Sequence, residues 1–451
     1  MIKKVLIANR GEIAARIIRT CKRLGIITVA VYSEADQKAP YVSLADESYL
    51  IGPPRVNDSY LNTEKIFSVA KEAGADAIHP GYGFLSENDQ FVEKCDQEGI
   101  IFIGPSSKVM KQMGSKIEAR IAMQKAGIPV VPGTDVAISS IEEAIEIAHG
   151  ISYPVMLKAS AGGGGIGMQV VSSDEELSKA FESNSKRALT FFGDGSMFME
   201  KKLENARHIE IQLLADHHGN VVHLFERDCS IQRRNQKVVE EAPSTFISQQ
   251  TRDAMGKASV KAAKALGYTN AGTIEFLVDE DENFYFLEMN TRIQVEHPVT
   301  EEITGLDIVE EQLKIANGKK LEITQENLAI NGHAIEVRIY AEDPVTFFPS
   351  PGHITTFVMP EGEHIRNETA VTGGFDVTPY YDPMIGKLIV KGTTRNEAIS
   401  LLKDALLMYK VEGIKTNIPM LLKVVDNEQF KKGNISTAFV EEHYLPEMKT
   451  N

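Results

Sequence analysis

The first hundred residues alternate between short apolar runs and amphipathic segments, and this alternation restricts the fold more than any other feature. The runs KKVLIA, ITVAVYS, DAIHPG and IIFIGP are predicted strands. Apolar side chains recur at helical spacing in GEIAARIIRTCKRLG, and Gly25 fits a helix C-terminal cap. Strands that alternate with helices form a parallel sheet covered on both faces. We therefore predict a Rossmann-like N-terminal domain over residues 1–113.

The turn after the first strand argues against a dinucleotide cofactor. It reads NRGEIA and lacks the G-x-G-x-x-G pattern that brings a backbone close to a pyrophosphate. The chain also lacks the G-x-x-x-x-G-K-[ST] pattern of a P-loop. Any nucleotide site must therefore be built in another way.

The length of 451 residues exceeds what one hydrophobic core can hold, so several domains are expected. The composition changes near Gly114, where the helical segment SKIEARIAMQKAG leads to IPVVPG. We predict a second domain over 114–330, with a small α/β insertion over 133–202. A third, mixed α+β domain is predicted over 331–447, with a strand in IEVRIY and helices in DALLMYKVEG and IPMLLKVV.

Charge, cysteine content and hydropathy exclude several classes of protein. The net charge of −15 argues against a nucleic-acid binder, which carries a basic surplus. Cys21, Cys95 and Cys229 are too far apart for a disulfide framework or a zinc site, which indicates a reducing compartment. The apolar start is too short for a signal peptide, and no run reaches the roughly 18 apolar residues of a membrane span. We expect a cytoplasmic protein that does not enter a membrane.

The glycine run in ASAGGGGIG is the first candidate ligand site. It lies between PVMLK and MQVV, which predicts a hairpin with a long glycine loop. Because residues 162–165 have no Cβ, their N–H groups can close around phosphate oxygens, and Lys158 can reach the same phosphates. Such a loop on a small subdomain is also typical of a mobile lid that excludes water. A loop that is merely flexible is the alternative.

Two glutamates in neighbouring predicted strands form the second candidate site. AGTIEFLVD and FYFLEMN are expected to pair across the acidic turn DEDEN, and they carry Glu275 and Glu288. A carboxylate among Ile, Phe and Leu costs much to bury unless a cation neutralises it. With the Asn290 oxygen, the pair makes a hard oxygen site that suits Mg²⁺. The alternative is two edge glutamates that face solvent.

The stretch EMNTRIQVEHPVTE, residues 288–301, follows directly and alternates polar with apolar side chains. If it stays extended to Glu296, alternate residues share one face and lie about 6–7 Å apart. The polar positions are Glu288, Asn290, Arg292, Gln294 and Glu296. An ordinary half-exposed strand would show the same alternation.

These features together resemble the ATP-grasp superfamily and, within it, the biotin carboxylase family. The similarity covers nearly the whole chain and is carried by IANRGEIAARI, HPGYGFLSEN, KASAGGGGIGM, ERDCSIQRRNQKVVEEAP, EMNTRIQVEHPVTE, GHAIEVRIYAEDP and PYYDPMIGKL. It implies that ATP phosphorylates bicarbonate to carboxyphosphate and that N1′ of biotin is then carboxylated. It also implies ATP and Mg²⁺ as cofactors, with Mn²⁺ as an alternative, in the first half-reaction of a bacterial acetyl-CoA carboxylase in fatty-acid synthesis.

The resemblance implies a role for each matching residue. The residues around ATP would be Lys116, Lys158, Gly162, Gly163, Gly164, Gly165, Met168, Glu200, Lys201, Leu203, His208, Gln232, Leu277 and Glu288. The magnesium ligands would be Glu275, Glu288 and Asn290. Bicarbonate would contact Lys237, Arg292, Gln294 and the Val295 backbone, and Glu296 would be its general base. Arg338 would stabilise the biotin oxyanion, and Tyr82 with Gly83 would place the ureido ring.

The chemistry of these side chains supports the catalytic set Glu296, Arg338, Arg292 and Lys237. A guanidinium can bind planar bicarbonate bidentately, and a fixed cation stabilises a developing oxyanion. A closed, dry site beside anions is expected to raise the pKa of Glu296 toward a useful range. The alternatives are a structural ion pair for Arg338, a solvated charge run for Lys237 in RRNQK and a structural role for the histidine at 208.

Two positions depart from the family pattern. Ile166 stands where many members have arginine or lysine, and Asn235 where some have histidine, which affects nucleotide affinity and not the reaction class. A non-catalytic nucleotide-binding subunit is therefore one alternative. Another is a carboxylate–amine ligase or a carbamoyl-phosphate-type enzyme with the same loop and metal pair.

The expected partners follow from what the chain does not contain. MKT at Met448 has no small β domain around it of the kind that carries biotin on lysine. We therefore expect a separate biotin carboxyl carrier protein and separate carboxyltransferase subunits. The chain could instead be the first part of a longer pyruvate or acyl-CoA carboxylase. The family resemblance also implies a homodimer.

Overall fold

The N-terminal region is a five-stranded parallel sheet in the order β3-β2-β1-β4-β5. The computed structural model describes residues 1–160, 168–369 and 371–449. The strands are β1 (Lys4–Ile7), β2 (Ile27–Ser33), β3 (Glu47–Gly52), β4 (Ala77–His79) and β5 (Ile101–Phe102). The helices of this region are α1 (Gly11–Arg23), α2 (Pro40–Leu44), α3 (Thr63–Ala73), α4 (Asp89–Glu98) and α5 (Ser107–Gly114), with short turns η1 (Glu34–Asp36) and η2 (Val56–Asp58).

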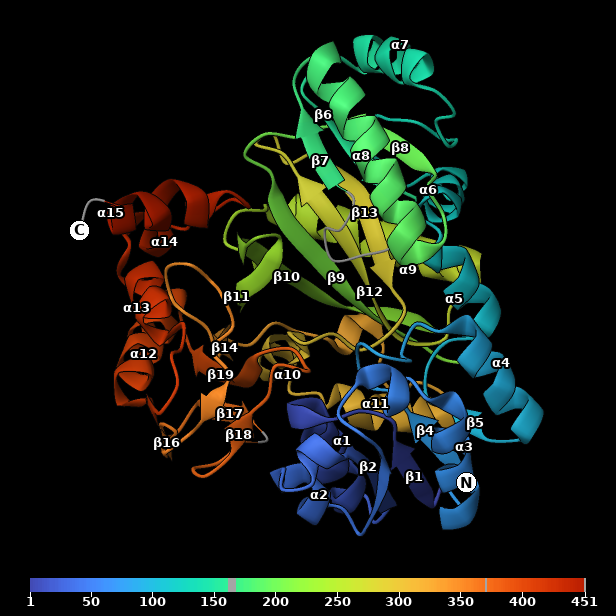
Figure 1. The fold of residues 1–451 in the computed structure, drawn as a ribbon, viewed down its shortest axis with the longest axis vertical. Coiled ribbons are helices and arrows are strands. Elements are labelled where there is room, and N and C mark those ends of the chain that lie inside the picture. Colours follow the sequence, from blue (N-terminus) through green and yellow to red (C-terminus); the bar gives the residue numbers. More distant parts are fainter. Residues whose placement is uncertain (161–167, 370, 450–451) are drawn as a thin grey trace.

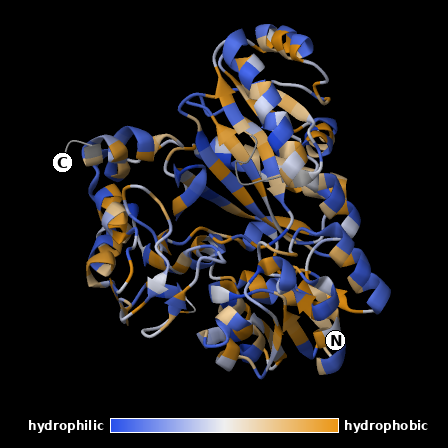
Figure 2. Ribbon diagram, viewed as in Figure 1, coloured by the Kyte–Doolittle hydropathy of each residue, from blue (hydrophilic) through white to orange (hydrophobic). Residues whose placement is uncertain are grey.

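Both faces of this sheet are buried, as the alternating sequence predicts. Val5 and Ile7 pack into one hydrophobic cluster, whereas Leu6 and Ala8 pack into another on the opposite face. Figure 2 shows the apolar character of these strands at the lower end of the molecule. Gly25 follows α1 with a φ of +71°, which confirms its predicted place at the end of that helix.

A small antiparallel sheet of order β7-β6-β8 lies at the upper end of the molecule (Figure 1). Its strands are β6 (Val155–Ala159), β7 (Met168–Val171) and β8 (Met197–Lys201), and its helices are α7 (Ile141–Ile151) and α8 (Asp174–Phe192). β6 and β7 pair with Lys158 opposite Met168, which confirms the predicted hairpin. Gly162, Gly163, Gly164, Gly165 and Ile166 lie outside the described residues, so the predicted lid loop stays a prediction.

An eight-stranded sheet of order β13-β12-β9-β10-β11-β14-β19-β17 forms the centre of the molecule. Its strands are β9 (Arg207–Ala215), β10 (Val221–Arg233), β11 (Gln236–Ala242), β12 (Asn270–Val278), β13 (Phe284–Asn290), β14 (His333–Tyr340), β17 (Ile365–Thr369) and β19 (Met384–Gly392). The helices along it are α6 (Lys116–Lys125), α9 (Gln249–Leu266), α10 (His297–Thr304) and α11 (Ile308–Ala316), with the turn η3 (Gln325–Asn327). Because β11 pairs with β14, the sheet continues without a break from the middle of the chain into its C-terminal region.

The C-terminal region adds helices and two short ribbons to the end of this sheet. The helices are α12 (Arg395–Met408), α13 (Ile418–Asp426), α14 (Glu428–Lys432), η4 (Val440–Tyr444) and α15 (Leu445–Lys449). The ribbons are β15 (Gly352–His353) with β18 (Asp376–Val377), and β16 (Thr356–Val358) with β20 (Lys410–Glu412). The expected helix over DALLMYKVEG is wrong at its end, because Tyr409 takes an extended conformation and Val411 pairs with Phe357.

The expectation that residues 288–296 form one extended strand is also wrong. β13 ends at Asn290, which is paired with Thr273, and residues 291–296 belong to no strand. α10 begins at His297 with Pro298 in its first turn, a position where proline favours a helix start. The side chains of this segment are therefore not arranged by strand alternation, and their positions depend on other contacts.

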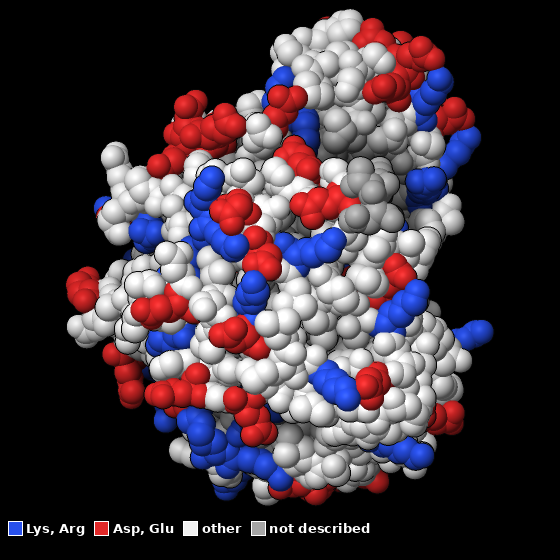
Figure 3. Space-filling view, turned by 90° about the vertical axis from the view of Figure 1, so that its left-hand side faces the viewer, with Lys and Arg blue, Asp and Glu red and all other residues white. Residues whose placement is uncertain are grey.

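The surface carries both signs of charge. Figure 3 shows lysine and arginine interspersed with aspartate and glutamate on the face that lies to the left in Figure 1. None of the helices in the described part of the chain combines the length and the hydropathy that a membrane crossing requires.

Candidate active site

Three carboxylates lie side by side across neighbouring strands of the central sheet. In the strand register, Glu210 on β9 is opposite Glu275 on β12, which in turn is opposite Glu288 on β13. The predicted pairing of Glu275 with Glu288 is therefore confirmed. Like charges that face each other in a sheet are destabilising unless cations compensate them. This row of acidic groups marks a place where positive charge is required.

Lys237, on β11, supplies part of that charge. Its ammonium group lies 2.6 Å from Glu210 Oε2, 2.8 Å from Glu275 Oε1 and 2.6 Å from Glu296 Oε1. The side chain is only 13% exposed, so the solvated-run interpretation of RRNQK is wrong for this residue. Burial alone would lower the pKa of Lys237, but the three carboxylates raise it well above its usual range. Lys237 is therefore a largely buried cation shared by carboxylates from β9, β12 and the residue that precedes α10.

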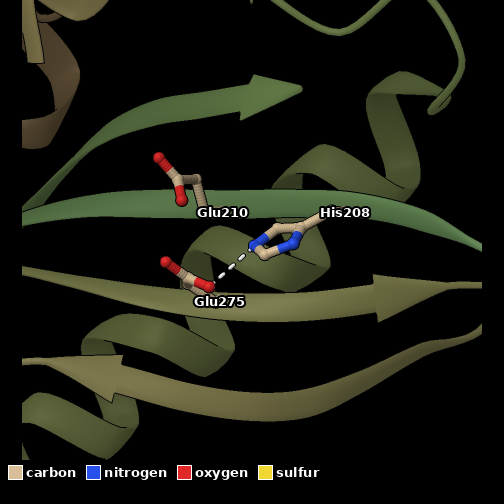
Figure 4. Close-up of side chains that lie close together, drawn as sticks. All are labelled: His208, Glu210 and Glu275. Carbon is tan, nitrogen blue, oxygen red and sulfur yellow. Dashed lines mark ion pairs between the residues drawn. The ribbon is translucent and has the colours of Figure 1, made fainter. Parts of the chain in front are cut away.

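His208, Glu210 and Glu275 form the group drawn in Figure 4, with ligand atoms within 4.8 Å of one another. His208 Nε2 lies 2.7 Å from Glu275 Oε2, and Gln232 Nε2 lies 3.0 Å from His208 Nδ1. Glu210 is already compensated, because both Lys237 and Arg227 donate to it. The structure thus brings His208 and Gln232, two of the predicted nucleotide residues, to Glu275.

Glu275, Glu288 and Asn290, the predicted metal ligands, lie together. Asn290 Nδ2 donates to Glu275 Oε1 across 2.8 Å, and its Oδ1 accepts from Arg292 Nη2 across 2.9 Å. Burial and the neighbouring Glu275 both raise the pKa of Glu288 above its usual range. A divalent cation would relieve this repulsion, and two carboxylates with an amide are the oxygen donors that Mg²⁺ prefers. The residues present therefore fit a magnesium ion.

Glu296, at the start of α10, is held by cations on both oxygens. Its Oε1 faces Lys237, and its Oε2 accepts from Arg338 Nη2 across 3.0 Å. Burial would raise the pKa of Glu296, but Lys237, Arg338 and Arg227 lower it below its usual range. The expectation of a raised pKa is therefore wrong, because cations contact both oxygens of this carboxylate and outweigh the effect of burial.

Arg338, on β14, makes a second contact behind Glu296. Its Nε donates to Glu240 Oε1 across 2.6 Å, and Arg338 is 9% exposed. Burial raises the pKa of Glu240 to about 7, and Arg338 opposes this. The guanidinium is therefore held by one carboxylate through Nε while its Nη2 donates to another.

The segment that carries Arg292, Gln294 and Val295 is held by partners from several elements. Arg292 Nε donates to Glu87 Oε2 across 2.9 Å, and Glu87 also accepts from the Thr291 backbone N–H across 3.0 Å. Gln294 Nε2 donates to Glu275 Oε1 across 2.7 Å. The predicted bicarbonate residues therefore lie beside the acidic row, although no strand aligns them.

The remaining predicted nucleotide residues gather between the small sheet and the central sheet. Lys158 forms a buried ion pair with Glu200, and Lys116 Nζ lies 3.5 Å from the Ala159 carbonyl oxygen. Burial lowers the pKa of Lys116, and Lys158 adds to this, whereas Glu288 and Glu200 oppose it. Met168 pairs with Lys158, Leu277 is opposite His208, and Lys201 ends β8 just before Leu203. Asn235 lies in the exposed turn between β10 and β11 with a φ of +61°.

Tyr82 and Gly83 lie in the loop after β4, at the N-terminal side of the site. The Tyr82 hydroxyl donates to Glu12 Oε1, and Gly83 has a φ of +70° that favours glycine. Burial and Glu12 raise the pKa of Tyr82 well above its usual range, while nearby Arg338 opposes this. Arg338 therefore lies close enough to Tyr82 to act on it electrostatically.

Sequence reasoning missed Arg227, whose guanidinium contacts several side chains of the site. This fully buried guanidinium donates to Glu210 at 2.5 Å, Gln212 at 2.8 Å, Gln294 at 2.7 Å and Thr300 at 2.9 Å. Glu210, Glu240 and Glu87 were missed as well. The alternation in RHIEIQLL was a usable signal for Glu210, because polar residues at every second position of a central strand need buried partners.

Three family models match the chain in sequence order. "Biotin carboxylase, N-terminal domain" matches residues 1–110, "Carbamoyl-phosphate synthase L chain, ATP binding domain" matches 115–324, and "Biotin carboxylase C-terminal domain" matches 336–442. Biotin carboxylase 2 of Bacillus subtilis (strain 168) is 64% identical over 443 residues, which cover 98% of this chain and 100% of that protein.

Solved structures give the same result. A biotin carboxylase–beta-gamma-ATP complex from Campylobacter jejuni has a TM-score of 0.97 at 50% identity, covering 98% of this chain and 99% of that chain. The biotin carboxylase domain dimer of Hydrogenobacter thermophilus 2-oxoglutarate carboxylase, with MgADP, ADP and bicarbonate, has a TM-score of 0.96 at 51% identity and covers 98% of both chains. The matches confirm the predicted fold class, with an ATP-grasp domain between the parallel sheet and a mixed C-terminal domain. The chain belongs to the biotin carboxylase family and is a ligase of that class.

Proposed function

We propose that the site carboxylates N1′ of biotin with bicarbonate at the expense of ATP, with each side chain in the role that the family resemblance implies. The observation that carries the proposal is the double restraint on Glu296. One oxygen faces Lys237 at 2.6 Å and the other faces Arg338 at 3.0 Å, beside the Glu275–Glu288 pair. One buried place thus contains a base, two cations that can bind anions, and an acidic pair that can bind a metal.

ATP would lie between the small sheet and the central sheet. Lys116 and Lys158 would contact its phosphates, and β8 with Glu200, Lys201 and Leu203 would border the adenine. Magnesium, when bound by Glu275, Glu288 and Asn290, supplies positive charge that offsets the charge of the phosphates. The burial of Lys158 and Glu200 as an ion pair supports this placement, because a nucleotide phosphate could replace the carboxylate as partner of Lys158.

Bicarbonate would bind against Arg292, Gln294 and the Val295 backbone, with Lys237 opposite. Glu296 would accept its proton, which makes the bicarbonate oxygen a better nucleophile toward the γ-phosphate. Because the pKa of Glu296 is low in the ligand-free site, its carboxylate is ionised when bicarbonate binds and can accept the proton afterwards. An added anion would compete for Lys237 and Arg338 and would raise the pKa of Glu296 at that moment.

Biotin would bind on the Arg338 side. The guanidinium, fixed by Glu240, would stabilise the oxyanion that forms on the ureido oxygen, and Tyr82 and Gly83 would border the ring. The hydrogen bond from Nε to Glu240 restrains the guanidinium before biotin binds, which favours electrostatic preorganisation.

We further propose that the carboxyl group passes to acetyl-CoA through a separate biotin carboxyl carrier protein and carboxyltransferase subunits. Two relatives named only as biotin carboxylase are 64% and 63% identical and two more with such names are at 53% and 51%, whereas those named for pyruvate and 2-oxoglutarate are at 52% and 51%. We propose a homodimer, as in the Hydrogenobacter thermophilus structure, and a cytoplasmic location, which the three free, buried cysteines support. The domain limits 1–113, 114–330 and 331–447 are proposed on the same basis.

One assay tests the reaction. ATP hydrolysis is measured with magnesium and bicarbonate, with and without free biotin, and carboxybiotin is detected directly. We expect turnover that requires bicarbonate and is stimulated by biotin. Turnover that ignores both would overturn the proposal, and stimulation by an amine in place of biotin would favour a carboxylate–amine ligase.

A second assay tests the acceptor and the partners. The tagged chain, together with the proteins that co-purify with it, is supplied with ATP, magnesium, labelled bicarbonate and one of acetyl-CoA, pyruvate or 2-oxoglutarate. Label in malonyl-CoA supports the proposal, and label in a carboxylated keto acid contradicts it. Light scattering of the purified chain gives the oligomeric state, for which a dimer mass is expected.

A further inference from the structure

Residues 291–296 have to be held in place without the hydrogen-bond ladder of a strand. β13 ends at Asn290, and α10 begins only at His297. The side chains at the start of this segment have partners of their own, Glu87 for Arg292 and Glu275 for Gln294. The peptide bond that joins Val295 to Glu296 is the part nearest the proposed base. Whatever fixes this peptide also fixes the direction in which Glu296 leaves the backbone.

Lys387, on β19, makes that contact. Its Nζ donates to the Val295 carbonyl oxygen across 2.6 Å, and the side chain is fully buried. In the antiparallel register Lys387 is opposite Arg338 on β14, so both side chains extend from the same face of the sheet. Two neighbouring cations therefore contact two consecutive residues, Lys387 the backbone of Val295 and Arg338 the carboxylate of Glu296.

Lys387 also contacts the N-terminal region. Its Nζ lies 3.2 Å from Glu12 Oε1 in the first turn of α1, and the same oxygen accepts from the Tyr82 hydroxyl. Glu12 Oε2 is buried and has no hydrogen-bond partner among the described residues. One ammonium group thus joins three regions that are far apart in sequence, with Tyr82 on one side and Val295 on the other.

We propose that Lys387 is a positioning residue for the reaction, which orients the Val295–Glu296 peptide and couples it to Tyr82 through Glu12. The inference deepens the proposed function and relies on it for the roles of Glu296, Val295 and Tyr82. A buried ammonium costs several kcal/mol to desolvate unless its partners compensate it. A purely structural ion pair with Glu12 would satisfy that need, but it would not require the carbonyl of Val295. The contact with a main-chain oxygen next to the base is what assigns a positioning role.

The first measurement is independent of catalysis. Hydrogen–deuterium exchange is followed in the ligand-free full chain for the parent, Lys387→Met and Lys391→Met. Lys391 lies on the same strand, is half-buried and lines a pocket whose described lining includes none of the site residues, so it controls for loss of a lysine from β19. We expect exchange in peptides covering 291–297 to become about tenfold faster in Lys387→Met and to stay unchanged in Lys391→Met. Unchanged exchange in both variants would overturn the proposal.

The second measurement separates positioning from general destabilisation. In Lys387→Met we expect kcat/KM for bicarbonate to fall at least about tenfold, with KM for ATP within about twofold of the parent, because small displacements of a reacting group cost this much. Lys387→Arg keeps the charge and an N–H donor and is expected to lose only about threefold. A parallel rise of KM for ATP and bicarbonate, or kinetics equal to the parent, would overturn the proposal.

Two further outcomes are covered, a variant that does not fold and a parent that shows no turnover. If Lys387→Met does not fold, Lys387→Gln, which removes the charge and shortens the side chain, is used for both measurements, and values equal to the parent in both would overturn the proposal. If the parent itself shows no bicarbonate-dependent turnover, the proposed function fails, whereas the exchange measurement still decides whether Lys387 positions residues 291–297.

Discussion

Arg338 and Glu296 form an ion pair of 3.0 Å between a strand of the C-terminal region and the first residue before α10. The proposed biotin cation and the proposed base therefore contact each other directly in the ligand-free protein. Substrate anions would have to enter between them, or beside them, to react. Each partner can be tested by a change that leaves the other in place.

Glu296→Gln keeps the shape of the side chain and removes its ability to accept a proton. We expect biotin-dependent ATP turnover to fall by about 10²- to 10⁴-fold, the usual contribution of a general base, with KM for ATP little changed. Steady-state kinetics measure this. The exposed Glu326, on η3, gives the control Glu326→Gln, and an equal loss in both variants would contradict the role of Glu296.

Arg338→Lys keeps the charge but loses the fork that contacts Glu240 and Glu296 together. We expect kcat/KM for biotin to fall by about 10²-fold, because a single ammonium cannot hold both contacts and present a fixed charge to the oxyanion. The matched control is Arg187→Lys on the exposed side of α8. Parent-like biotin kinetics in Arg338→Lys would show that charge alone is sufficient.

Arg227→Met is a stability prediction. It removes the partner of five buried polar side chains and leaves Lys237 as the one cation among the described residues that still contacts Glu210. Breaking a buried charge pair costs about 3–5 kcal/mol, so we expect a clearly lower midpoint in urea or heat unfolding. Arg187→Met, at an exposed position, should change the midpoint little, and a similar small change in Arg227→Met would contradict the structure.

The burial of Glu336 predicts that the stability of the protein depends on pH. It is fully buried, and neither carboxylate oxygen has a hydrogen-bond partner among the described residues. Burial raises its pKa well above the usual range, Glu240 adds to this, and Lys387 opposes it. The native state then binds a proton more tightly than the unfolded state does. Its contribution is full below the unfolded pKa of about 4.3 and is lost as the pH rises through the folded pKa.

Glu336→Gln cannot titrate, so the fall in stability from about pH 5 upward should be shallower than in the parent. Unfolding midpoints measured from pH 5 to 9 check this. A parent-like slope in the variant would show that Glu336 is ionised in the native protein.

Glu241 predicts the opposite slope. Burial would raise its pKa, but the hydrogen bond from His333 and the ion pair with Arg395 lower it to about 2. Its stabilising contribution is present above the unfolded pKa of about 4.3 and is lost as the pH falls toward 2. Glu241→Gln should therefore lower the stability at pH 7 more than at pH 3, and equal losses at both values would contradict the lowered pKa.

The pairing of β12 with β13 could be predicted from the local sequence pattern, but the end of β13 at Asn290 could not. The acidic turn DEDEN between two apolar runs is enough to predict that Glu275 and Glu288 face each other. Polar and apolar residues alternate past Asn290 whether or not a partner strand is present, so the alternation does not indicate that the strand ends there. The signal against an extended segment was Pro298, which favours a helix start.

The surroundings of Lys237 could not be predicted from its neighbours in the sequence either. A lysine in RRNQK looks like part of a solvated charge run, since its carboxylate partners come from β9, β12 and the start of α10. No short window of sequence contains these partners. The lowered pKa of Glu296 could not be predicted for the same reason, because it depends on cations that only the tertiary structure brings together.

The pairing of β11 with β14 has a further consequence for how the protein tolerates change. These strands carry Lys237 and Arg338, and their ladder runs from Val239 opposite Val337 to Ala242 opposite Ala334. Lys237 and Arg338 lie just beyond the Val239 end of this ladder, so the pairing of the two strands, and not the length of chain between them, brings both cations to Glu296. Surface loops between β11 and β14 could therefore lengthen, shorten or acquire new binding functions while the separation of the two cations stays the same.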